Sequence, residues 1–264
     1  MLPMPRRAPE AVMETSRAFI ARHFGEAGRA WLEGLPVARA ATAARWQLEL
    51  GPALPGGLLA AVNLVTRRDG SPAVLKLSGP WGDSAREVAA LRAWEGGGAP
   101  RVLDFEPEAG AILLERIEPG THPAEAPAAR VATLLARLHV DPPAGLPYLA
   151  EVVRRRIGKA LGDGRTSSAK AAWARAKLVE LEDGSPPGVL LHGDFDERNL
   201  LVCVRRGLCA IDPHPCVGDP AYDAGYWVHG NRRPGRGARL DALVALGFER
   251  ARVRDWAAVV GVHG

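Results

Sequence analysis

Three polar residues in the second half of the chain have the types and spacing needed to transfer a phosphoryl group. Asp194 and Asn199 lie five positions apart, just after the apolar run Val189–Leu191, and Asp212 follows two further apolar stretches. Phosphoryl transfer needs a carboxylate that accepts the proton of the acceptor hydroxyl, and oxygen ligands that hold Mg²⁺ on the phosphates. Asp194 suits the catalytic base, and the side-chain oxygens of Asn199 and Asp212 suit the metal ligands.

The order of these residues is close to that of protein kinases, which use H-R-D-x-x-x-x-N followed by D-F-G. In this chain glycine replaces the arginine, since the first motif reads His192-Gly193-Asp194, and the second motif reads Asp212-Pro213-His214. Either aspartate alone could be an ordinary turn residue. The ordered set behind an apolar strand favours a catalytic role for both.

The chain resembles the aminoglycoside/hydroxyurea antibiotic resistance kinases, which include streptomycin 6-phosphotransferases. The resemblance covers about residues 30–256 and is carried by the His-Gly-Asp-x-x-x-x-Asn motif, by Ile211-Asp212-Pro213, and by the segments 72–76, 87–91, 113–120 and 217–223. It implies a protein-kinase-like fold, ATP and Mg²⁺ as cofactors, and a small hydroxylated acceptor. An aminoglycoside such as streptomycin is the expected acceptor, and antibiotic resistance is the expected consequence.

The resemblance also assigns residues to the nucleotide. Lys76, in the apolar segment 73–77, would hold the ATP phosphates and pair with Glu87. A lone lysine in a strand is often an edge residue whose amine reaches solvent. The chain has only four lysines among its 34 basic residues, and an ammonium group and a guanidinium group are not equivalent at a phosphate, which favours the functional role. Glu87 has a second possible role, as partner of Ser84 in a capping box at a helix start.

Two further nucleotide contacts are expected. Gly56 and Gly57 lie where a loop over the phosphates should be, although a plain turn is the alternative. By resemblance alone, backbone groups of Glu115 and Ile117 would bind adenine.

Several polar residues near the catalytic motif have structural alternatives. We expect His192 to brace the catalytic turn rather than act as an acid or base. Asp219 and Asp223 could cap the next helix or brace the loop, and the structural role is favoured for both. The chain departs from the family at Asp196 and His214, where relatives often carry His and Lys, so the acceptor contacts there are expected to differ.

The apolar periodicity and turn signals predict an α+β chain with two lobes, a strand-rich N-terminal lobe over 1–117 and a mainly helical C-terminal lobe over 118–264. The expected helices cover 12–24, 26–44, 84–94, 124–140, 148–161, 167–182, 222–228 and segments after 239, and the expected strands cover 46–50, 60–66, 73–77, 101–106, 111–117, 189–191, 200–204 and 208–211.

Composition restricts the remaining function classes. The net charge is +4, but the arginines are dispersed, and the densest groups, Arg154–Arg156 and the arginines of 232–239, are not interleaved with aromatic residues that would stack on bases. The three cysteines form no C-x-x-C pair, which argues against disulfides and zinc and favours a reducing cytoplasm. No apolar run reaches the roughly 18 residues of a membrane span. We therefore expect a cytoplasmic protein, a monomer or weak dimer, that binds neither nucleic acid nor membrane.

Four functions are compatible with parts of this pattern. The first is an antibiotic-inactivating phosphotransferase, and the second is a kinase for another small metabolite, for a natural-product intermediate or for hydroxyurea. The third is a non-catalytic nucleotide-binding protein, which the joint presence of Lys76, Asp194, Asn199 and Asp212 argues against. The fourth is a nucleic-acid-binding protein, suggested only by the positive charge. The sequence favours the first two and does not separate them.

Overall fold

The computed structural model describes residues 17–54, 59–230 and 235–263, and its contacts divide the chain into two compact units. The first unit comprises Met1–Val88 and Arg101–Arg116, and the second comprises Ala89–Pro100 and Ile117–Gly264. Helix α3 (Ser84–Trp94) therefore contributes to both. Its last residue belongs with the second unit, where the indole Nε1 of Trp94 donates to the carbonyl of Leu138 at 2.7 Å. Each unit is described by itself below.

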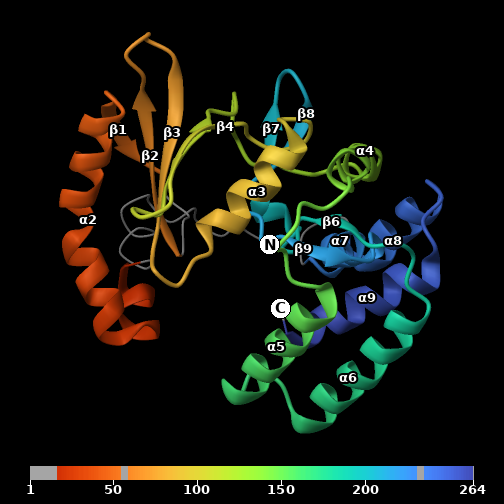
Figure 1. Cartoon of the computed structure of the whole chain (residues 1–264). Coiled ribbons are helices and arrows are strands. Elements are labelled where there is room, and N and C mark those ends of the chain that lie inside the picture. The colour runs from red at the N-terminus through yellow and green to blue at the C-terminus, as the bar shows by residue number, and fades with distance from the viewer. Residues whose placement is uncertain (1–16, 55–58, 231–234, 264) are drawn as a thin grey trace, which may run out of the picture. The chain divides into compact units, whose positions relative to one another are not determined.

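The first unit is built on a five-stranded antiparallel sheet with the strand order β1-β2-β3-β5-β4 (Figure 1). Strands β2 and β3 pair on either side of the Asp69-Gly70 turn, as the sequence predicts. Because β3 lies between β2 and β5, it is a central strand. The bounds are β1 Glu49–Ala53, β2 Ala60–Thr66, β3 Pro72–Ser78, β4 Val102–Glu106 and β5 Ala111–Glu115.

One helix covers this sheet. Helix α2 (Gly25–Arg45), preceded by helical residues 17–23, buries Leu35 against apolar side chains of β2, β3 and β5, among them Val65 and Leu75. The predicted strand at 46–50 is wrong in its position. Trp46 and Gln47 close the helix instead, and β1 continues through Pro52, which an edge strand tolerates because a missing N–H donor there costs no ladder bond.

Asp83 is the residue that caps the start of α3. The N–H of Arg86 donates to its Oδ1 at 3.0 Å, and the N–H of Glu87 donates to its carbonyl at 3.1 Å. The predicted capping box of Ser84 and Glu87 is therefore wrong, because the cap lies one residue earlier. The carboxylate of Glu87 is engaged elsewhere, as described below.

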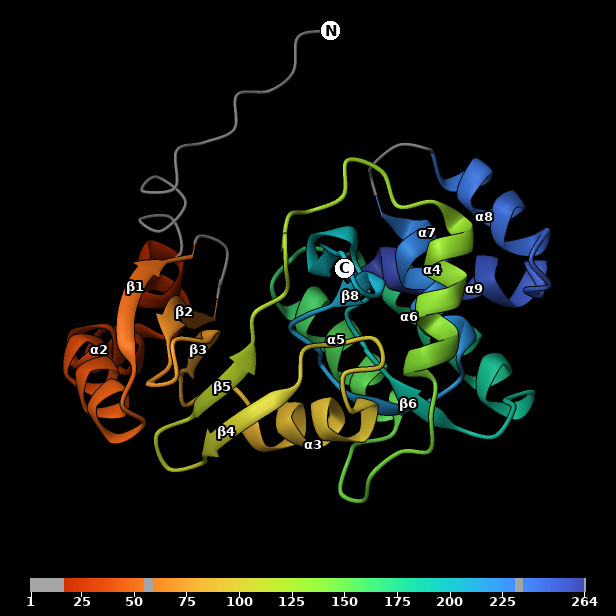
Figure 2. The same cartoon turned by 90° about the horizontal axis from the view of Figure 1, so that it is seen from above.

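The second unit is mainly helical. Helices α5, α6 and α9 pack side by side, and α7 lies against α9 (Figures 1 and 2). Their shared core includes Ile157, Leu178, Tyr222 and Trp256, all almost fully buried. The bounds are α4 Ala128–Leu138, α5 Leu149–Gly162, α6 Ser168–Asp183, α7 Ala221–His229, α8 Arg236–Val244 and α9 Arg250–His263.

Two short antiparallel pairs in this unit flank the segment from His192 to Asn199. Strand β6 (Val189–Leu191) pairs with β9 (Cys216–Gly218), and β7 (Leu200–Cys203) forms a hairpin with β8 (Gly207–Ala210). The hairpin is predicted correctly. Strand β9 is missed because Cys216-Val217-Gly218 is not an apolar run like that of β6 and contains a glycine typical of a turn.

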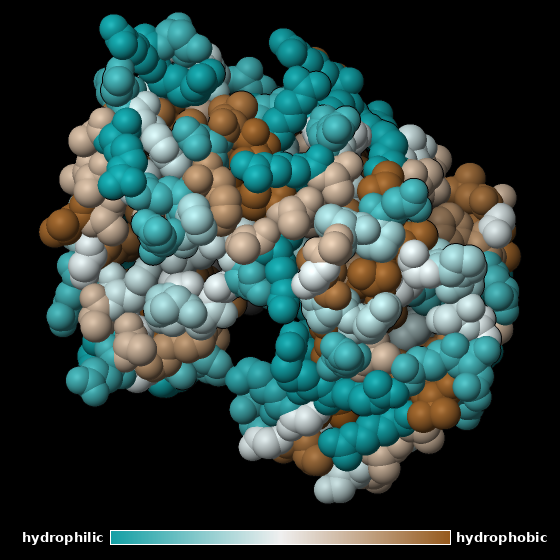
Figure 3. Space-filling view, viewed as in Figure 1, coloured by the Kyte–Doolittle hydropathy of each residue, from teal (hydrophilic) through white to brown (hydrophobic). Residues whose placement is uncertain are grey.

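The exposed large apolar side chains come from different elements, such as Val37 on α2, Leu103 on β4 and Val179 on α6. On the face drawn in Figure 3, hydrophobic residues are intermixed with hydrophilic ones. Among the helices of the described residues, none combines the length and apolar character that crossing a bilayer would require.

Candidate active site

The turn after β6 explains why the motif carries glycine where protein kinases carry arginine. Gly193 has φ +76°, a conformation that residues with a side chain rarely adopt. A Cβ at this position would lie 2.0 Å from the carbonyl oxygen of His214, which is backbone and cannot move aside cheaply. Only glycine allows the segment of His214 to pass this close to the residue that precedes Asp194.

The structure brings Asp194, Asn199 and Asp212 together. The Nδ2 of Asn199 donates to both the carbonyl and the Oδ2 of Asp194, at 2.9 Å each. The N–H of Ile211 donates to the carbonyl of Asn199 at 2.9 Å, which places Asp212 one residue from this contact although the β7–β8 hairpin separates the two in sequence. Asp212 has φ +57°, a left-handed conformation that aspartate tolerates better than most residues.

These residues fit a magnesium ion bound together with phosphates. Because the amide nitrogen of Asn199 is turned toward Asp194, its Oδ1 oxygen is the atom left to act as a ligand. Among the described residues, no cluster of three or more His, Cys, Asp or Glu side chains is arranged to hold a metal. Mg²⁺ commonly needs no such cluster, since one or two protein oxygens suffice when substrate phosphates and water complete the shell.

His192 braces the turn, as the sequence predicts. Its ring is completely buried and is stacked on Trp94 with the centroids 6.2 Å apart. Its Nε2 lies 3.0 Å from the carbonyl of Ile211, and the N–H of Asp194 donates to its Nδ1 at 3.3 Å. The ring therefore joins the backbone of Asp194 to the segment that carries Asp212.

Asp223 holds the same turn through its backbone amides. The carboxylate is completely buried and accepts from the N–H of His192 at 2.8 Å and from the N–H of Gly193 at 3.0 Å. The Nε2 of His139 lies 3.2 Å from the same group. Burial alone would raise the pKa of Asp223, but the hydrogen bond and charge of His139 and the contacts with His192 outweigh it and lower the pKa.

Replacing Asp223 with asparagine should lower the free energy of unfolding by about 3 kcal/mol, because an NH₂ group then faces backbone donors. The lowered pKa means that the ionised carboxylate stabilises the fold above pH ~4, near the pKa of an unfolded aspartate, and that this stabilisation is lost as the pH falls through the folded pKa. The difference between wild type and variant, measured by urea unfolding, should therefore shrink in acid. Asp163→Asn, at an exposed ion pair with Lys159, is the control and should cost less than about 1 kcal/mol. Equal effects of the two variants would contradict this role of Asp223.

Asp219 serves as a structural anchor for the last helix. Its Oδ1 accepts from the N–H of Ala221 at 2.9 Å, next to the start of α7. Its Oδ2 accepts from the guanidinium of Arg252 and from the indole of Trp256, both on α9. The structural role that the sequence favours is therefore present at both aspartates: Asp223 braces the turn, and Asp219 ties the start of α7 to α9, although the N-cap of α7 itself is Pro220.

Two side chains near Asp194 were missed by the sequence analysis. Burial raises the pKa of the Tyr226 phenol, and the negative charge of Asp194 and a hydrogen bond with that carboxylate raise it further. Arg198 pairs with Asp196 at 2.7 Å and also interacts electrostatically with Asp194. Tyr226 lies one helical turn after Tyr222 of the recognised motif, and that spacing is the signal that could have identified it.

In the first unit the structure brings Lys76 and Glu87 together. The Nζ of Lys76 on β3 lies 2.7 Å from both carboxylate oxygens of Glu87 on α3, and both side chains are buried. Since β3 is a central strand, the alternative in which Lys76 is an edge residue does not apply. The carboxylate of Glu87 therefore pairs with Lys76 and does not form a capping box with Ser84.

For the other residues predicted to contact the nucleotide, the structure shows only part of the surroundings. Gly56 and Gly57 lie outside the described residues. Glu115 ends β5, and its N–H donates to the carbonyl of Arg101 at 2.9 Å. Ile117 belongs to the second unit, where it is buried against Cys203 and Cys209 of the hairpin.

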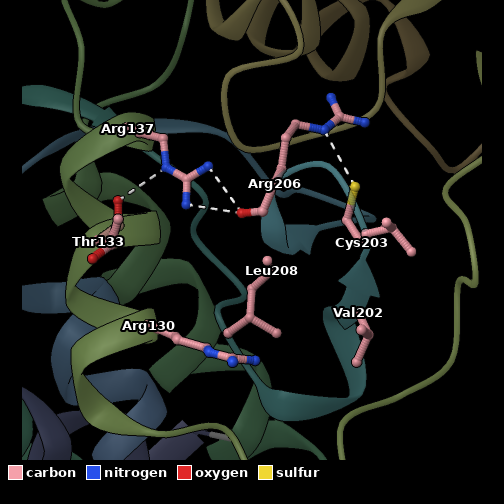
Figure 4. A pocket seen from close by; sticks show the side chains of 9 residues that line it. Arg130, Thr133, Arg137, Val202, Cys203, Arg206 and Leu208 are labelled. Carbon is pink, nitrogen blue, oxygen red and sulfur yellow. Dashed lines mark hydrogen bonds between the residues drawn. The ribbon is translucent and has the colours of Figure 1, made fainter.

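A groove of about 420 Å³ lies between α4 and the β7–β8 hairpin, and its lining residues include none of the predicted site residues (Figure 4). Arg137 on α4 donates through both terminal nitrogens to the carbonyl of Arg206, at 3.2 Å each. Arg206 itself bonds the carbonyl of Ala99 at 3.2 Å and lies 3.5 Å from the sulfur of Cys203. These bonds fasten the hairpin that has Asn199 at one end and Asp212 at the other.

Comparison with known proteins agrees with this geometry. The family described as aminoglycoside/hydroxyurea antibiotic resistance kinase matches residues 45–263. The chain is 38% identical to a hydroxyurea phosphotransferase of Kitasatospora aureofaciens, covering 89% of this chain and 73% of that protein. It is 36% identical to a streptomycin 6-kinase of Streptomyces griseus, covering 89% and 83%. A choline kinase of Streptococcus pneumoniae superposes with a TM-score of 0.63 at 14% identity, covering 87% of this chain and 89% of the other. The predicted protein-kinase-like fold is confirmed.

Proposed function

Since the chain belongs to the aminoglycoside/hydroxyurea antibiotic resistance kinase family, we propose that it transfers the γ-phosphoryl group of ATP to a hydroxyl of an aminoglycoside such as streptomycin. The observation that carries the reaction type is the hydrogen bond of Asn199 to Asp194, beside the segment of Asp212. This arrangement supports the proposal, because phosphoryl transfer needs a group that accepts the hydroxyl proton close to oxygen ligands for the metal.

Asp194 is the proposed base. One carboxylate oxygen is held by Asn199, and the backbone on its N-terminal side is fixed by His192. The other oxygen accepts the proton of the acceptor hydroxyl as that oxygen attacks the γ-phosphorus in line. Tyr226, whose phenol interacts with this carboxylate, would help to orient the acceptor hydroxyl.

Asn199 and Asp212 are the proposed ligands of Mg²⁺, which when bound would neutralise the charge that develops on the phosphates. In the first unit, Lys76 would hold the phosphates, with Glu87 fixing its ammonium group. Gly56 and Gly57 are proposed to cover the phosphates. Adenine would donate to the carbonyl of Glu115, whose N–H is already bonded within the sheet, and accept from the N–H of Ile117.

The two lobes divide these roles. We assign nucleotide binding to residues 1–117 and the catalytic loop, metal and acceptor to residues 118–264. The protein is proposed to work in the cytoplasm as a monomer or weak dimer on a small-molecule acceptor.

Hydroxyurea is the second candidate acceptor, because the chain is 38% identical to a hydroxyurea phosphotransferase. Both acceptors offer a hydroxyl to the same base. The chain should be incubated with ATP, Mg²⁺ and separately streptomycin, other aminoglycosides, hydroxyurea and simple sugars, with ADP release and product mass as readouts. Phosphorylated streptomycin is expected. Phosphorylated hydroxyurea alone would select the alternative, and no product with any acceptor would contradict the proposal.

Replacing Lys76 with alanine should lower kcat/KM for ATP by about 10²-fold, and Lys76→Arg should not restore it. The planar guanidinium cannot reproduce a compact charge that lies 2.7 Å from both oxygens of Glu87. Steady-state kinetics with varied ATP test this, and acceptor KM should change little. Lys159→Arg, at an exposed position on α5, is the matched control. Full activity of Lys76→Arg would show that the lysine has no specific role at the phosphates.

A further inference from the structure

The three arginines of the dense basic group Arg154–Arg156 on α5 have different surroundings in the structure. Arg154 forms an ion pair with Glu182 at the surface, with the atoms 2.5 Å apart, and Arg155 is exposed. Arg156 turns inward and is only partly exposed. One of three adjacent arginines is thus directed to the catalytic turn.

The guanidinium of Arg156 bonds three groups around that turn. Its Nη1 donates to the carbonyl of Gly193 and to the hydroxyl of Tyr222, at 2.8 Å each. Its Nη2 lies 3.5 Å from the Nδ1 of His214. None of these three hydrogen-bond partners is a carboxylate, and the charge of Arg156 also interacts through space with the carboxylate of Asp194.

The carbonyl of Gly193 belongs to the peptide unit that joins Gly193 to Asp194. The N–H of this unit donates to His192 at 3.3 Å, and its carbonyl accepts from Arg156. The preceding peptide unit is bonded by Asp223 through the N–H of Gly193. Both polar groups of the Gly193–Asp194 peptide are therefore hydrogen-bonded, which fixes the direction of the Asp194 side chain. Arg156 makes the bond to the carbonyl, and this residue lies outside the recognised motif.

We propose that Arg156 is a positioning residue for phosphoryl transfer, which holds the Gly193–Asp194 peptide so that the carboxylate of Asp194 points at the acceptor. This inference rests on the proposed function of Asp194. Arg156 acts through the backbone of Gly193 and through His214, which lies two residues after Asp212 and donates its N–H to the carbonyl of His192 at 2.8 Å.

The test compares Arg156→Lys with the neighbouring control Arg155→Lys. Lysine keeps the charge but cannot bond the peptide, the phenol and the imidazole together, so kcat should fall about 10- to 100-fold. The KM for ATP should stay within about twofold, since the contacts of Arg156 lie on the catalytic turn. Arg155→Lys should match the wild type. Tyr222→Phe removes one contact of Arg156 and keeps the bond to Gly193, so it should lower the melting temperature and reduce kcat less than Arg156→Lys does.

A purely structural role predicts a different pattern, in which Arg156→Lys lowers the melting temperature as Tyr222→Phe does and leaves kcat unchanged. That pattern would overturn the proposal. If Arg156→Lys does not fold, His214→Asn and His214→Ala replace it, because the asparagine oxygen can accept from Arg156 near the position of Nδ1. Under the proposal, the kcat of His214→Asn should be several-fold higher than that of His214→Ala. Equal kcat values of the two variants would contradict the proposal.

Hydrogen exchange separates this inference from the proposed function. In Arg156→Lys the amides of residues 189–199 should exchange about tenfold faster than in the wild type, since a bond from a charged donor is lost. Arg155→Lys should show no change. If the wild type phosphorylates no acceptor, the proposed function fails whatever the exchange shows. If the wild type is active but the exchange and kcat of Arg156→Lys are unchanged, only the role of Arg156 fails.

Discussion

Replacing Asp194 with alanine should reduce kcat by about 10²–10⁴-fold, the usual contribution of a general base, and leave the affinity for ATP nearly unchanged. The carboxylate accepts from Asn199 and Tyr226. None of these contacts involves Lys76 or Glu87, which are assigned to the phosphates, so nucleotide binding should survive the loss of the base.

The measurement is steady-state turnover with the acceptor selected by the panel, together with calorimetric titration of ATP and Mg²⁺. Asp196→Asn is the matched control. It removes a negative charge two residues away but keeps an oxygen that can accept from the N–H of Arg198, as Asp196 does at 2.9 Å. Turnover of this control should fall only a few-fold. Near-normal turnover of Asp194→Ala would remove Asp194 from the mechanism.

Replacing Asp212 with asparagine should raise the Mg²⁺ concentration needed for half-maximal activity at least tenfold and lower kcat/KM by about 10³-fold. Asparagine is the informative substitution because Asp212 has φ +57°. Asparagine tolerates this left-handed conformation, whereas alanine adds about 1–2 kcal/mol of backbone strain. The asparagine variant therefore loses the charge without a comparable loss of stability.

Two further variants define the metal site. Asp212→Ala should show the same Mg²⁺ dependence as Asp212→Asn but a lower melting temperature. Asn199→Ala should also weaken Mg²⁺-dependent nucleotide binding, and it should lower kcat further because Asp194 loses its hydrogen bond. Titrations of Mg²⁺ at fixed ATP measure these effects. An unchanged metal requirement in both Asp212→Asn and Asn199→Ala would exclude these residues as ligands.

The sequence predicts that Asp194, Asn199 and Asp212 lie close together because short-range order positions them. A buried strand, a glycine turn and a hairpin place Asp194, Asn199 and Asp212 next to one another with little freedom. The side chains that support the turn are not predictable in this way. Arg156 lies on α5 and His139 directly follows α4, and nothing in their local sequence shows that they approach Gly193 or Asp223.

The fold is predictable where apolar periodicity is long. The hairpin of β2 and β3, helix α3 and helix α6 are all found within a residue or two of their predicted bounds. The errors fall where one local signal outweighs another. Asp83, and not Ser84 as predicted, caps the start of helix α3. Gly51 and Pro52 are typical of a turn but lie inside the edge strand β1.

The β7–β8 hairpin has a consequence for how this site can change during evolution. Asn199 and Asp212 lie at the open end of the hairpin, and Leu200↔Ala210 is the first pair of its ladder. Residues added in matched pairs on both strands would lengthen the ladder and keep each side chain on its own face, whereas one residue added to one strand would turn every later side chain over. The distance in sequence between the two proposed ligands is therefore free to vary in steps of two. The fastening of Arg206 to α4 limits how far the tip can move away. A mutational scan of insertions in 203–207 should tolerate paired additions and reject single ones.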